Sequence, residues 1–359
     1  MRSMDQREAQ CFTDPLAEFS IAGTGVMVRE DGTLIQTLAL PYPVRRDSKG
    51  SFLAPSVWSF SSRGRDYHKM IRERLSAYAD TVRTGLQKTG FFLEPARIEV
   101  DTEEASERGL ALASGLGTIG KNQNLLLADR GSFFYLGVCY WSLPSQPSLA
   151  FRSCFPAYEK GTRVPDKDPC AGCQCCIKAC PGHALRPLAP EKTEKGKTGT
   201  LAGTPAYPGV FYDRKACLSQ LSQEKRVLTQ EEWEALGDRL FGCDSCQICC
   251  PYNKEALDAG KGEAGVEEAA EFFAMTNREL EARHGHRSGR WRGWPILRRN
   301  ALITLFNSWR RSPRGEKRDR LTEQVREALE LARKSSSPLL EGQARAIQEV
   351  FERERGERK

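Results

Sequence analysis

The sequence predicts an α+β fold in three successive parts. Strand-like and helix-like apolar patterns alternate over residues 1–160, cysteines crowd residues 161–262, and helical periodicity runs through residues 263–359. A chain of 359 residues is long enough to form more than one domain with its own buried core. Hydrophobic residues make up 39% and charged residues 28%, so most of the chain should be globular.

Strand-like segments and one long helix open the first part. Residues 20–45 carry short apolar runs on either side of the turn-like segment 30–32, which predicts strands. The carboxylate of Asp66 can cap the free amides of a helix that runs to Gly90. The apolar stripe of this helix consists of Ile71, Leu75, Val82 and Leu86.

A short strand, a second helix and a hairpin follow. Residues 96–101 predict the strand, and residues 103–114 predict the helix. Residues 124–141 are largely apolar on both sides of segment 129–131, which predicts a hairpin that turns there. Strands mixed with amphipathic helices indicate that residues 1–160 form an α+β domain.

The cysteines indicate metal binding rather than disulfides. Ten of the thirteen lie between Cys170 and Cys250. The polar start of the chain has no apolar segment typical of a signal peptide, and no apolar run reaches the roughly 18 to 20 residues that cross a bilayer. We therefore expect a cytoplasmic protein without a membrane segment, in which thiols stay reduced.

Two cysteine arrays have the spacing of a two-cluster ferredoxin. The first, CxxCxxCxxxCP, ends at Pro181 and consists of Cys170, Cys173, Cys176 and Cys180. The second, CxxCxxxCP, ends at Pro251 and consists of Cys243, Cys246 and Cys250. In bacterial ferredoxins the fourth cysteine of such a run binds the other of two clusters. The spacing therefore predicts two 4Fe-4S clusters with crossed ligands.

Crossing completes one ligand set and leaves the other one cysteine short. The complete set is Cys170, Cys173, Cys176 and Cys250, and the incomplete set is Cys180, Cys243 and Cys246. Cys217 and Cys249 are the candidates for the missing position. Cys249 is the neighbour of Cys250, and adjacent Cα atoms about 3.8 Å apart would be strained by serving two clusters. We therefore prefer Cys217 and leave Cys175 and Cys249 as spare thiols.

Zinc is the alternative metal for these thiols. Cysteines at CxxC spacing also build four-cysteine zinc sites. Zinc ribbons do not usually run CxxCxxC directly into Cys-Pro, as this chain does at Cys180 and Pro181. The spacing therefore favours iron-sulfur clusters, which transfer single electrons and need an acceptor.

The remaining segments predict an insertion and a helical end. Residues 190–209 are rich in Gly, Thr, Lys and Pro, which indicates a surface insertion. From about residue 267 the periodicity is helical, and Pro338 fits the first turn of a last helix. Paired short helices in this C-terminal part fit an α-solenoid fragment. The apolar stripes are Leu321, Val325, Leu329 and Ala332, then Ile347, Val350 and Phe351.

A basic segment lies at the start of this helical part. Residues 283–320 hold twelve Arg or Lys against two acidic residues, a net charge of +10 in a chain whose total is +7. A basic surface with interleaved aromatic side chains suits a nucleic acid. The alternative is a solvated helix face whose aromatic side chains lie in the core. The aromatic residues are Trp291, Trp294, Phe306 and Trp309.

The sequence GLGTIG at residues 115–120 matches the dinucleotide-binding pattern GxGxxG. That fingerprint requires a strand directly before the first glycine. Here a helix is predicted before it, so we reject a dinucleotide site.

Several collinear segments resemble epoxyqueuosine reductases. The resemblance covers about residues 60–310 and is interrupted mainly by the insertion at 190–209. Its segments are residues 64–75 (GRDYHKMIRERL), 100–122 (VDTEEASERGLALASGLGTIGKN), 131–137 (GSFFYLG), the two cysteine arrays, 239–253 (RLFGCDSCQICCPYN) and 277–301 (NRELEARHGHRSGRWRGWPILRRNA).

The resemblance implies three domains and an activity. Residues 1–160 would bind cobalamin, residues 161–262 would form a ferredoxin-like domain with two 4Fe-4S clusters, and residues 263–359 would form HEAT-like helices that bind tRNA. Such enzymes reduce the epoxide of epoxyqueuosine at the tRNA wobble position to queuosine. Electrons would pass from an external donor such as flavodoxin or ferredoxin through the clusters to cob(I)alamin, in a monomeric protein.

The resemblance also implies roles for individual residues. Asp101 matches the proton donor of the family. A carboxyl group can supply a proton only if burial raises its pKa toward neutrality. The alternative role of Asp101 is to cap the helix at 103–114, together with Glu104. Cofactor contacts would come from Tyr67, His68, Gly115, Gly117, Gly120, Lys121 and Asn122. Contacts with tRNA would come from Arg287, Arg290, Arg292, Arg298 and Arg299.

The chain departs from the resemblance near the expected substrate pocket. Glu103 stands where the family has a glycine, and Thr118 replaces a usual aromatic residue. A cysteine that is common in the family would fall near position 59, which is Ser59 here. The N-terminal segment is also shorter than usual. Two other functions therefore stay open: a related cobalamin-dependent reductase with a different substrate, and a two-cluster electron-transfer protein.

Overall fold

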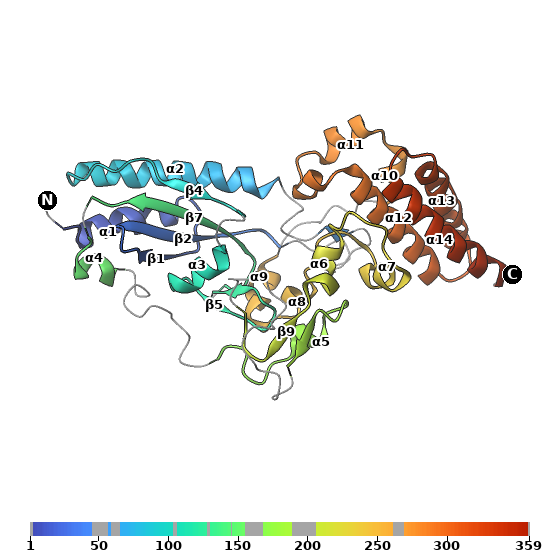
Figure 1. Ribbon diagram of the computed structural model, residues 1–359, viewed down its shortest axis with the longest axis horizontal. Coiled ribbons are helices and arrows are strands. Elements are labelled where there is room, and N and C mark those ends of the chain that lie inside the picture. The colour runs from blue at the N-terminus through green and yellow to red at the C-terminus, as the bar shows by residue number, and fades with distance from the viewer. Residues whose placement is uncertain are drawn as a thin grey trace.

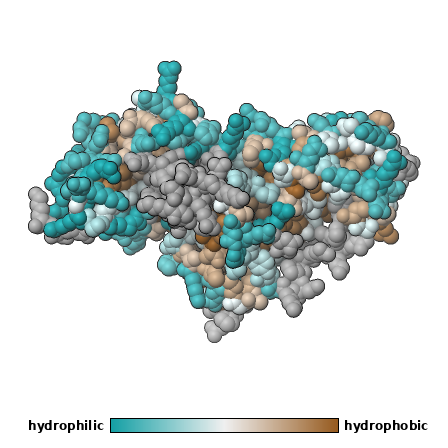
Figure 2. All heavy atoms as spheres, turned by 180° about the vertical axis from the view of Figure 1, so that it is seen from behind, coloured by the Kyte–Doolittle hydropathy of each residue, from teal (hydrophilic) through white to brown (hydrophobic). Residues whose placement is uncertain are grey.

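The computed structural model describes residues 3–44, 57–58, 65–102, 106–127, 130–144, 146–154, 168–188, 206–260 and 269–357. It shows an elongated molecule of mixed helix and sheet, with the sheet at one end, helices at the other and a lower lobe between them (Figure 1). The predicted boundaries at 160/161 and 262/263 lie outside the described residues. From behind, hydrophilic residues cover much of both ends, and hydrophobic residues gather on the lower lobe (Figure 2).

A four-stranded antiparallel sheet organises the N-terminal end, in the order β1-β2-β7-β4. Its strands are β1 (Gly23–Val28), β2 (Thr33–Pro41), β4 (Arg97–Glu99) and β7 (Phe134–Ser142). The predicted turn joins β1 to β2, and the side chain of Asp31 accepts the backbone N–H of Thr33 there. The strands expected within 20–45 and the strand at 96–101 are confirmed.

The hairpin predicted within residues 124–141 is wrong. β6 (Leu125–Leu126) pairs with β5 (Thr118–Ile119), whereas β7 lies between β2 and β4. β7 is largely buried, so both of its edges need ladder partners, which are the long strand β2 and the short strand β4. The isolated bridge Leu127–Gly131 lies at the predicted turn 129–131, and residues 128 and 129 lie outside the described residues.

Helices cover both faces of this sheet (Figure 1). α2 (Tyr67–Lys88) packs on one face, and its predicted stripe is buried against alternate residues of β2 such as Leu34 and Leu38. α3 (Glu107–Ala113) packs on the other face, near Ile35 and Ala39. Near α2 lie α1 (Gln6–Thr13) and the 3₁₀ turn η1 (Asp14–Leu16), and α4 (Leu149–Ser153) packs on α1.

Short elements build the cysteine-rich lobe. They are α5 (Cys175–Lys178), β8 (Leu185–Pro187), β9 (Val210–Tyr212), η4 (Arg214–Ala216), α8 (Ser245–Ile248), η5 (Pro251–Asn253) and α9 (Lys254–Ala259). β8 and β9 pair antiparallel, and the backbone N–H of Leu188 donates to the carbonyl oxygen of Gly209. The ends of the predicted insertion are therefore joined, while its residues 190–205 lie outside the described residues.

Helices at the C-terminal end share one core. They are α10 (Glu271–Ala274), α11 (Asn277–His284), η6 (Ser288–Arg292), α12 (Trp294–Arg311), α13 (Glu316–Arg333) and α14 (Pro338–Glu357). α12 is buried on nearly all sides and packs against α13 and α14, whose predicted stripes are buried.

This core also takes in a segment that was predicted to belong with the cysteines. α6 (Leu218–Leu221), α7 (Gln230–Leu236) and β10 (Arg239–Phe241) bury Trp233 and Leu240 against α12. β10 pairs in parallel with β3 (Val57–Trp58). The chain therefore leaves the cysteine lobe after Cys217 and returns to it at Cys243. No helix in the described part of the chain has the length and apolar character needed to cross a membrane.

Candidate active site and cysteine cavities

Asp101 lies just after β4, in the left-handed backbone region at φ 51°. Its carboxylate accepts a hydrogen bond from the Tyr67 hydroxyl at 2.8 Å and lies 3.1 Å from Nε2 of His68. Both partners belong to the first turn of α2, which begins there because Asp66 caps it by accepting the His68 backbone N–H. The structure thus brings together three residues that the sequence pointed to separately.

Asp101 does not cap the helix that follows. The N-cap of α3 is Ser106, whose hydroxyl oxygen accepts the backbone N–H of Gly109 at 3.2 Å. The expected partner Glu104 lies outside the described residues. Among the described residues the helix is α3, which starts at Glu107, and the alternative pairing of Asp101 with Glu104 involves a residue outside the described part of the chain.

The pKa of Asp101 is lowered, not raised. Its hydrogen bond with His68 is the largest cause, and its side chain is 60% exposed, so desolvation does not dominate. The pKa of His68 is raised, first by the same hydrogen bond, and Asp66 contacts the other ring nitrogen at 2.6 Å. At neutral pH these directions favour an ionised Asp101 beside a protonated His68. The expectation that burial raises the pKa of Asp101 is wrong for the protein in this state.

A cavity of about 300 Å³, here called the Asp101 cavity, opens beside this carboxylate. Aromatic rings form one wall: Tyr135 stacks on Tyr67 with centroids 4.7 Å apart and planes 9° from parallel, and Tyr42 packs on Tyr135. The lining residues are Tyr42, Tyr67, Asp101, Glu107, Arg108, Asn124, Leu125, Ser132, Phe134, Tyr135, Leu136 and Gln247. The arrangement is a flat-walled site with one exposed carboxylate.

Glu107 is a functional candidate that the sequence interpretation missed. Its carboxylate accepts the backbone N–H of Asp101 and lines the same cavity. Burial, the largest cause, raises the pKa of Glu107 to about 7. Glu107 lies within the segment 100–122 that carried the resemblance, but nothing in its spacing distinguishes it from a first-turn helix carboxylate.

Two cavities gather the predicted metal ligands. Cavity A, of about 90 Å³, is lined by Lys121, Asn122, Leu126, Pro169, Cys170, Cys173, Cys175, Cys176, Cys250, Pro251 and Tyr252. Cavity B, of about 210 Å³, is lined by Arg108, Asn122, Gln123, Asn124, Cys180, Pro181, Ala184, Leu185, Tyr212, Cys217, Leu218, Ser219, Cys243, Asp244, Ser245, Cys246 and Gln247. Each cavity contains one of the two predicted sets of four cysteines.

The spare thiols divide as well. Cys249 lines neither cavity, whereas Cys217 lines cavity B, which agrees with the preference for Cys217. Cys175 lines cavity A and is exposed. Among the described residues, no three His, Cys, Asp or Glu side chains converge on a site for a single metal ion.

Burial makes these thiols hard to ionise without a metal. It raises the pKa of Cys176 to about 12 and that of Cys246 well above its usual value. A bound metal removes the proton from a coordinating thiol and compensates the charge. The donor sets therefore fit a cationic metal group, such as the core of an iron-sulfur cluster.

The three cavities adjoin one another. Asn122 lines both cavity A and cavity B. Arg108, Asn124 and Gln247 line both cavity B and the Asp101 cavity. A path of neighbouring sites thus runs from cavity A through cavity B to Asp101.

The predicted cofactor loop is divided between different sites. Lys121 and Asn122 line cavity A rather than the Asp101 cavity, and the Lys121 ammonium donates to the carbonyl oxygens of Cys170 at 2.8 Å and Cys173 at 2.9 Å. Gly117 is required by packing, because a Cβ there would lie 2.5 Å from the carbonyl oxygen of Leu126. Gly115 ends α3 with φ 73°, and Gly120 packs on Leu126.

Two of the five arginines predicted to contact tRNA use their guanidinium groups in hydrogen bonds within the protein. Arg299 is fully buried, so its predicted role is wrong. Its guanidinium donates to the carbonyl oxygens of Leu221, Ser222, Glu224 and Arg226 and to the side chain of Asn300. Arg298 donates to Phe272, Met275 and Asn277 and holds α10 and α11 against α12.

The other three arginines lie nearer the surface. Arg292 stacks on Trp291, which is 55% exposed, and Arg290 stacks on Trp294. Arg287 is partly exposed and bridges to Arg65 through the backbone. Trp294, Phe306 and Trp309 are buried, so the core interpretation is right for three of the four aromatic residues.

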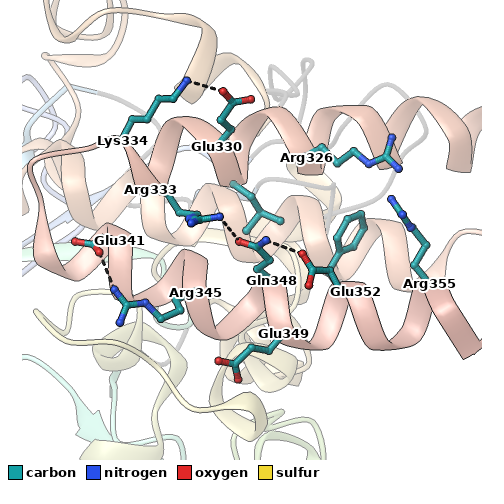
Figure 3. A pocket seen from close by; sticks show the side chains of 12 residues that line it. Arg326, Glu330, Arg333, Lys334, Glu341, Arg345, Gln348, Glu349, Glu352 and Arg355 are labelled. Atoms are coloured by element: carbon teal, nitrogen blue, oxygen red, sulfur yellow. Dashed lines mark hydrogen bonds and ion pairs between the residues drawn. The ribbon is translucent and has the colours of Figure 1, made fainter.

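A further cavity, of about 890 Å³, lies between α13 and α14 (Figure 3). Its charged side chains largely satisfy one another: Lys334 pairs with Glu330, and Arg345 pairs with Glu341. Arg333 bonds to Gln348, which in turn donates to Glu352. No predicted site residue lines this groove.

The sequence is similar to curated epoxyqueuosine reductases, although no protein-family model matches it. It is 30% identical over 285 residues to the enzyme of Bacillus subtilis, covering 76% of this chain and 62% of the relative. It is also 30% identical over 283 residues to the enzyme of Listeria monocytogenes, covering 76% of this chain and 63% of that relative. The chain therefore spans a little over three fifths of the length of these relatives.

The fold is also similar to solved structures. An epoxyqueuosine reductase crystallised with an epoxyqueuosine-modified tRNA stem loop matches with a TM-score of 0.64 and 20% identity, over 95% of this chain and 98% of that one. The enzyme of Streptococcus thermophilus matches with a TM-score of 0.63 and 20% identity over the same shares. The predicted resemblance and the mixed helix and sheet fold are confirmed.

Proposed function

We propose that this chain, a relative of the epoxyqueuosine reductases, reduces the epoxide of epoxyqueuosine at the wobble position of tRNA to give queuosine. The observation that carries the proposal is the path of adjoining cavities, from two sets of four cysteines to the carboxylate of Asp101. An electron carrier needs the cysteines but has no use for a third cavity with a carboxylate. A solved relative holds an epoxyqueuosine-modified stem loop, which supports the choice of substrate.

Two 4Fe-4S clusters would be the electron carriers. One would be held in cavity A by Cys170, Cys173, Cys176 and Cys250, and the other in cavity B by Cys180, Cys217, Cys243 and Cys246. Each set follows the crossed logic of two-cluster ferredoxins. The order of the cavities supports electron flow from A to B.

Cobalamin would be the acceptor, with its reacting face toward the Asp101 cavity. When bound and reduced to cob(I)alamin, it supplies a strongly reducing metal centre. The flat wall of Tyr67 and Tyr135 suits a planar ring. The cavity volume of about 300 Å³ is at the lower end of small-molecule sites, roughly 300 to 1,000 Å³. A corrinoid would therefore lie only partly inside it.

Asp101 would deliver a proton to the epoxide oxygen. Tyr67 and His68 aim its carboxylate, and the protonated imidazole keeps a proton within hydrogen-bond distance of it. In a solved structure of the Bacillus subtilis enzyme, which matches with a TM-score of 0.58, a catalytic loop that carries an aspartate is swung out of the active site. Asp101 lies on a loop directly after β4, which supports the same role here.

The tRNA surface would include Arg287, Arg290 and Arg292, with exposed Trp291 available to stack on a base. An external donor such as flavodoxin or ferredoxin would approach cavity A, where Cys175 is exposed. We propose a monomer that acts in the cytoplasm, where its tRNA substrate is found.

The test is the tRNA of cells that lack this chain. We expect epoxyqueuosine to accumulate and queuosine to disappear in digested tRNA analysed by mass spectrometry. Wild-type chain should restore queuosine, and Asp101→Asn should not, because amide replaces the proton donor. Unchanged queuosine in the deletion strain would exclude this substrate. The purified, reconstituted protein should also bind a corrinoid, since failure to do so would leave only an electron carrier.

A further inference from the structure

We propose that Glu107 is a positioning residue that holds Asp101 in place and stores the second proton that the reaction consumes. The proposal rests on the proposed function above and assigns the proton supply of the same site. Three observations carry it: a backbone hydrogen bond, a shared cavity and the chemistry of epoxide reduction.

The chemistry requires two protons for each turnover. Reducing an epoxide to an alkene breaks both C–O bonds, forms a C=C bond and releases the oxygen as water. The balance is two electrons, supplied by the reduced iron-sulfur and corrinoid centres proposed above, and two protons. One carboxyl group donates one proton, so Asp101 must be reprotonated or assisted before water can leave.

The geometry places Glu107 where it can control Asp101. The Glu107 carboxylate accepts the backbone N–H of Asp101, across the segment between β4 and α3. Asp101 has φ 51°, a conformation that costs a non-glycine residue free energy and persists only when its surroundings hold it. This hydrogen bond therefore helps keep the Asp101 side chain directed at Tyr67 and His68.

The surroundings of Glu107 suit a group that exchanges protons near neutral pH. The groups that face it are Asp101 after β4, Tyr67 and His68 on α2, Arg108 on α3 and Tyr140 on β7. The pKa of Glu107 is raised to about 7, first by burial and also by the charge of Asp101, while the Asp101 N–H, His68 and Arg108 act in the opposite direction.

The sign of the pH dependence follows from these pKa values. Below about pH 7 Glu107 is protonated and can pass a proton into the cavity. Above about pH 7 Glu107 is deprotonated and has no proton to pass on. The pKa of Asp101 is lowered, so Asp101 cannot retain its own proton at neutral pH. Turnover should therefore fall as the pH rises through about 7.

The first measurement needs no activity. In protein carrying ¹³C-labelled glutamate carboxyl groups, NMR should show one resonance with a titration midpoint near pH 7. That resonance should be missing in Glu107→Gln and unchanged in Glu73→Gln, an exposed residue on the outer side of α2. A wild-type spectrum without any midpoint above about pH 6 would overturn the proton store, whatever the substrate proves to be.

The second measurement is single turnover on an epoxyqueuosine-containing stem loop. Glu107→Gln keeps an acceptor for the Asp101 N–H but cannot store a proton, so we expect a rate about 10- to 100-fold lower, within the usual range for acid–base groups. Its decline through pH 7 should disappear. Glu107→Ala also loses the hydrogen bond and should be slower still, with iron, corrinoid and tRNA binding retained.

The outcomes separate this inference from the proposed function. Glu107→Gln with the wild-type rate and pH profile would overturn the proton store, and Glu107→Ala equal to Glu107→Gln would overturn the positioning role. Wild-type protein that shows the NMR midpoint near pH 7 but never reduces the stem loop would instead overturn the proposed function.

Discussion

Cavities A and B each gather four predicted cysteine ligands, but their surroundings differ. Cavity A is the smaller, at about 90 Å³ against about 210 Å³, and includes the exposed Cys175. Cavity B shares Arg108, Asn124 and Gln247 with the Asp101 cavity. Under the proposed function this difference gives a direction: electrons would enter at cavity A, where Cys175 is exposed, and would leave from cavity B toward the Asp101 cavity.

The two cavities also differ in how the chain builds them. The predicted ligands of cavity A come from the two arrays that the sequence shows. Those of cavity B include Cys217 as well, which comes from a third segment between β9 and α6. Because the chain passes through the C-terminal core between Cys217 and Cys243, cavity B links the cysteine lobe to the helices.

Replacing Cys217 should have the largest effect. We expect Cys217→Ser to lose about four of roughly eight iron atoms, since one cubane loses a ligand, and to abolish turnover. Cys249→Ser is the matched control, because Cys249 belongs to the same lobe but lines neither cavity. Iron analysis and anaerobic absorbance measure the loss. Full iron in Cys217→Ser together with reduced iron in Cys249→Ser would reverse the ligand assignment of cavity B.

Replacing Lys121 should have an intermediate effect, confined to cavity A. Its ammonium donates hydrogen bonds to the carbonyl oxygens of Cys170 and Cys173. Lys121→Met therefore removes a positive charge beside the cluster proposed for cavity A. We expect that cluster's reduction potential to fall by tens of millivolts, because nearby charge tunes cluster potentials. Potentiometric EPR should show the other cluster unchanged. Lys178→Met, an exposed lysine on α5, is the control, and an equal shift in it would remove the special role of Lys121.

Replacing Cys175 should have the smallest effect. Cys175→Ser should keep wild-type iron content and turnover, because the other four cysteines of cavity A complete its ligand set. Its exposure predicts that it is the first thiol alkylated in the loaded protein, which peptide mass spectrometry detects. A loss of iron in Cys175→Ser would mean that it, and not one of the other four, is a ligand.

Local patterns predicted the elements that depend on neighbours in sequence. The Asp66 cap and the stripe of Ile71 and Leu75 determine α2, because both act within a few residues. The pairing of β7 was mispredicted, since strand partners are chosen from the whole chain. The basic segment misled for the same reason: Arg299 counts as a surface charge in the sequence, whereas carbonyl groups more than 70 residues away enclose it.

The sequence alone determined the two crossed cysteine arrays, the long helix that presents Tyr67 and His68, and the resemblance that singles out Asp101. These depend on spacing, which is written in the order of residues. Only the tertiary structure decided between the two candidates Cys217 and Cys249 at cavity B, brought the Lys121 ammonium to the backbone of cavity A, and joined the Glu107 carboxylate to the Asp101 N–H. Burial and charge at a residue depend on what distant segments pack around it, and no local pattern records that.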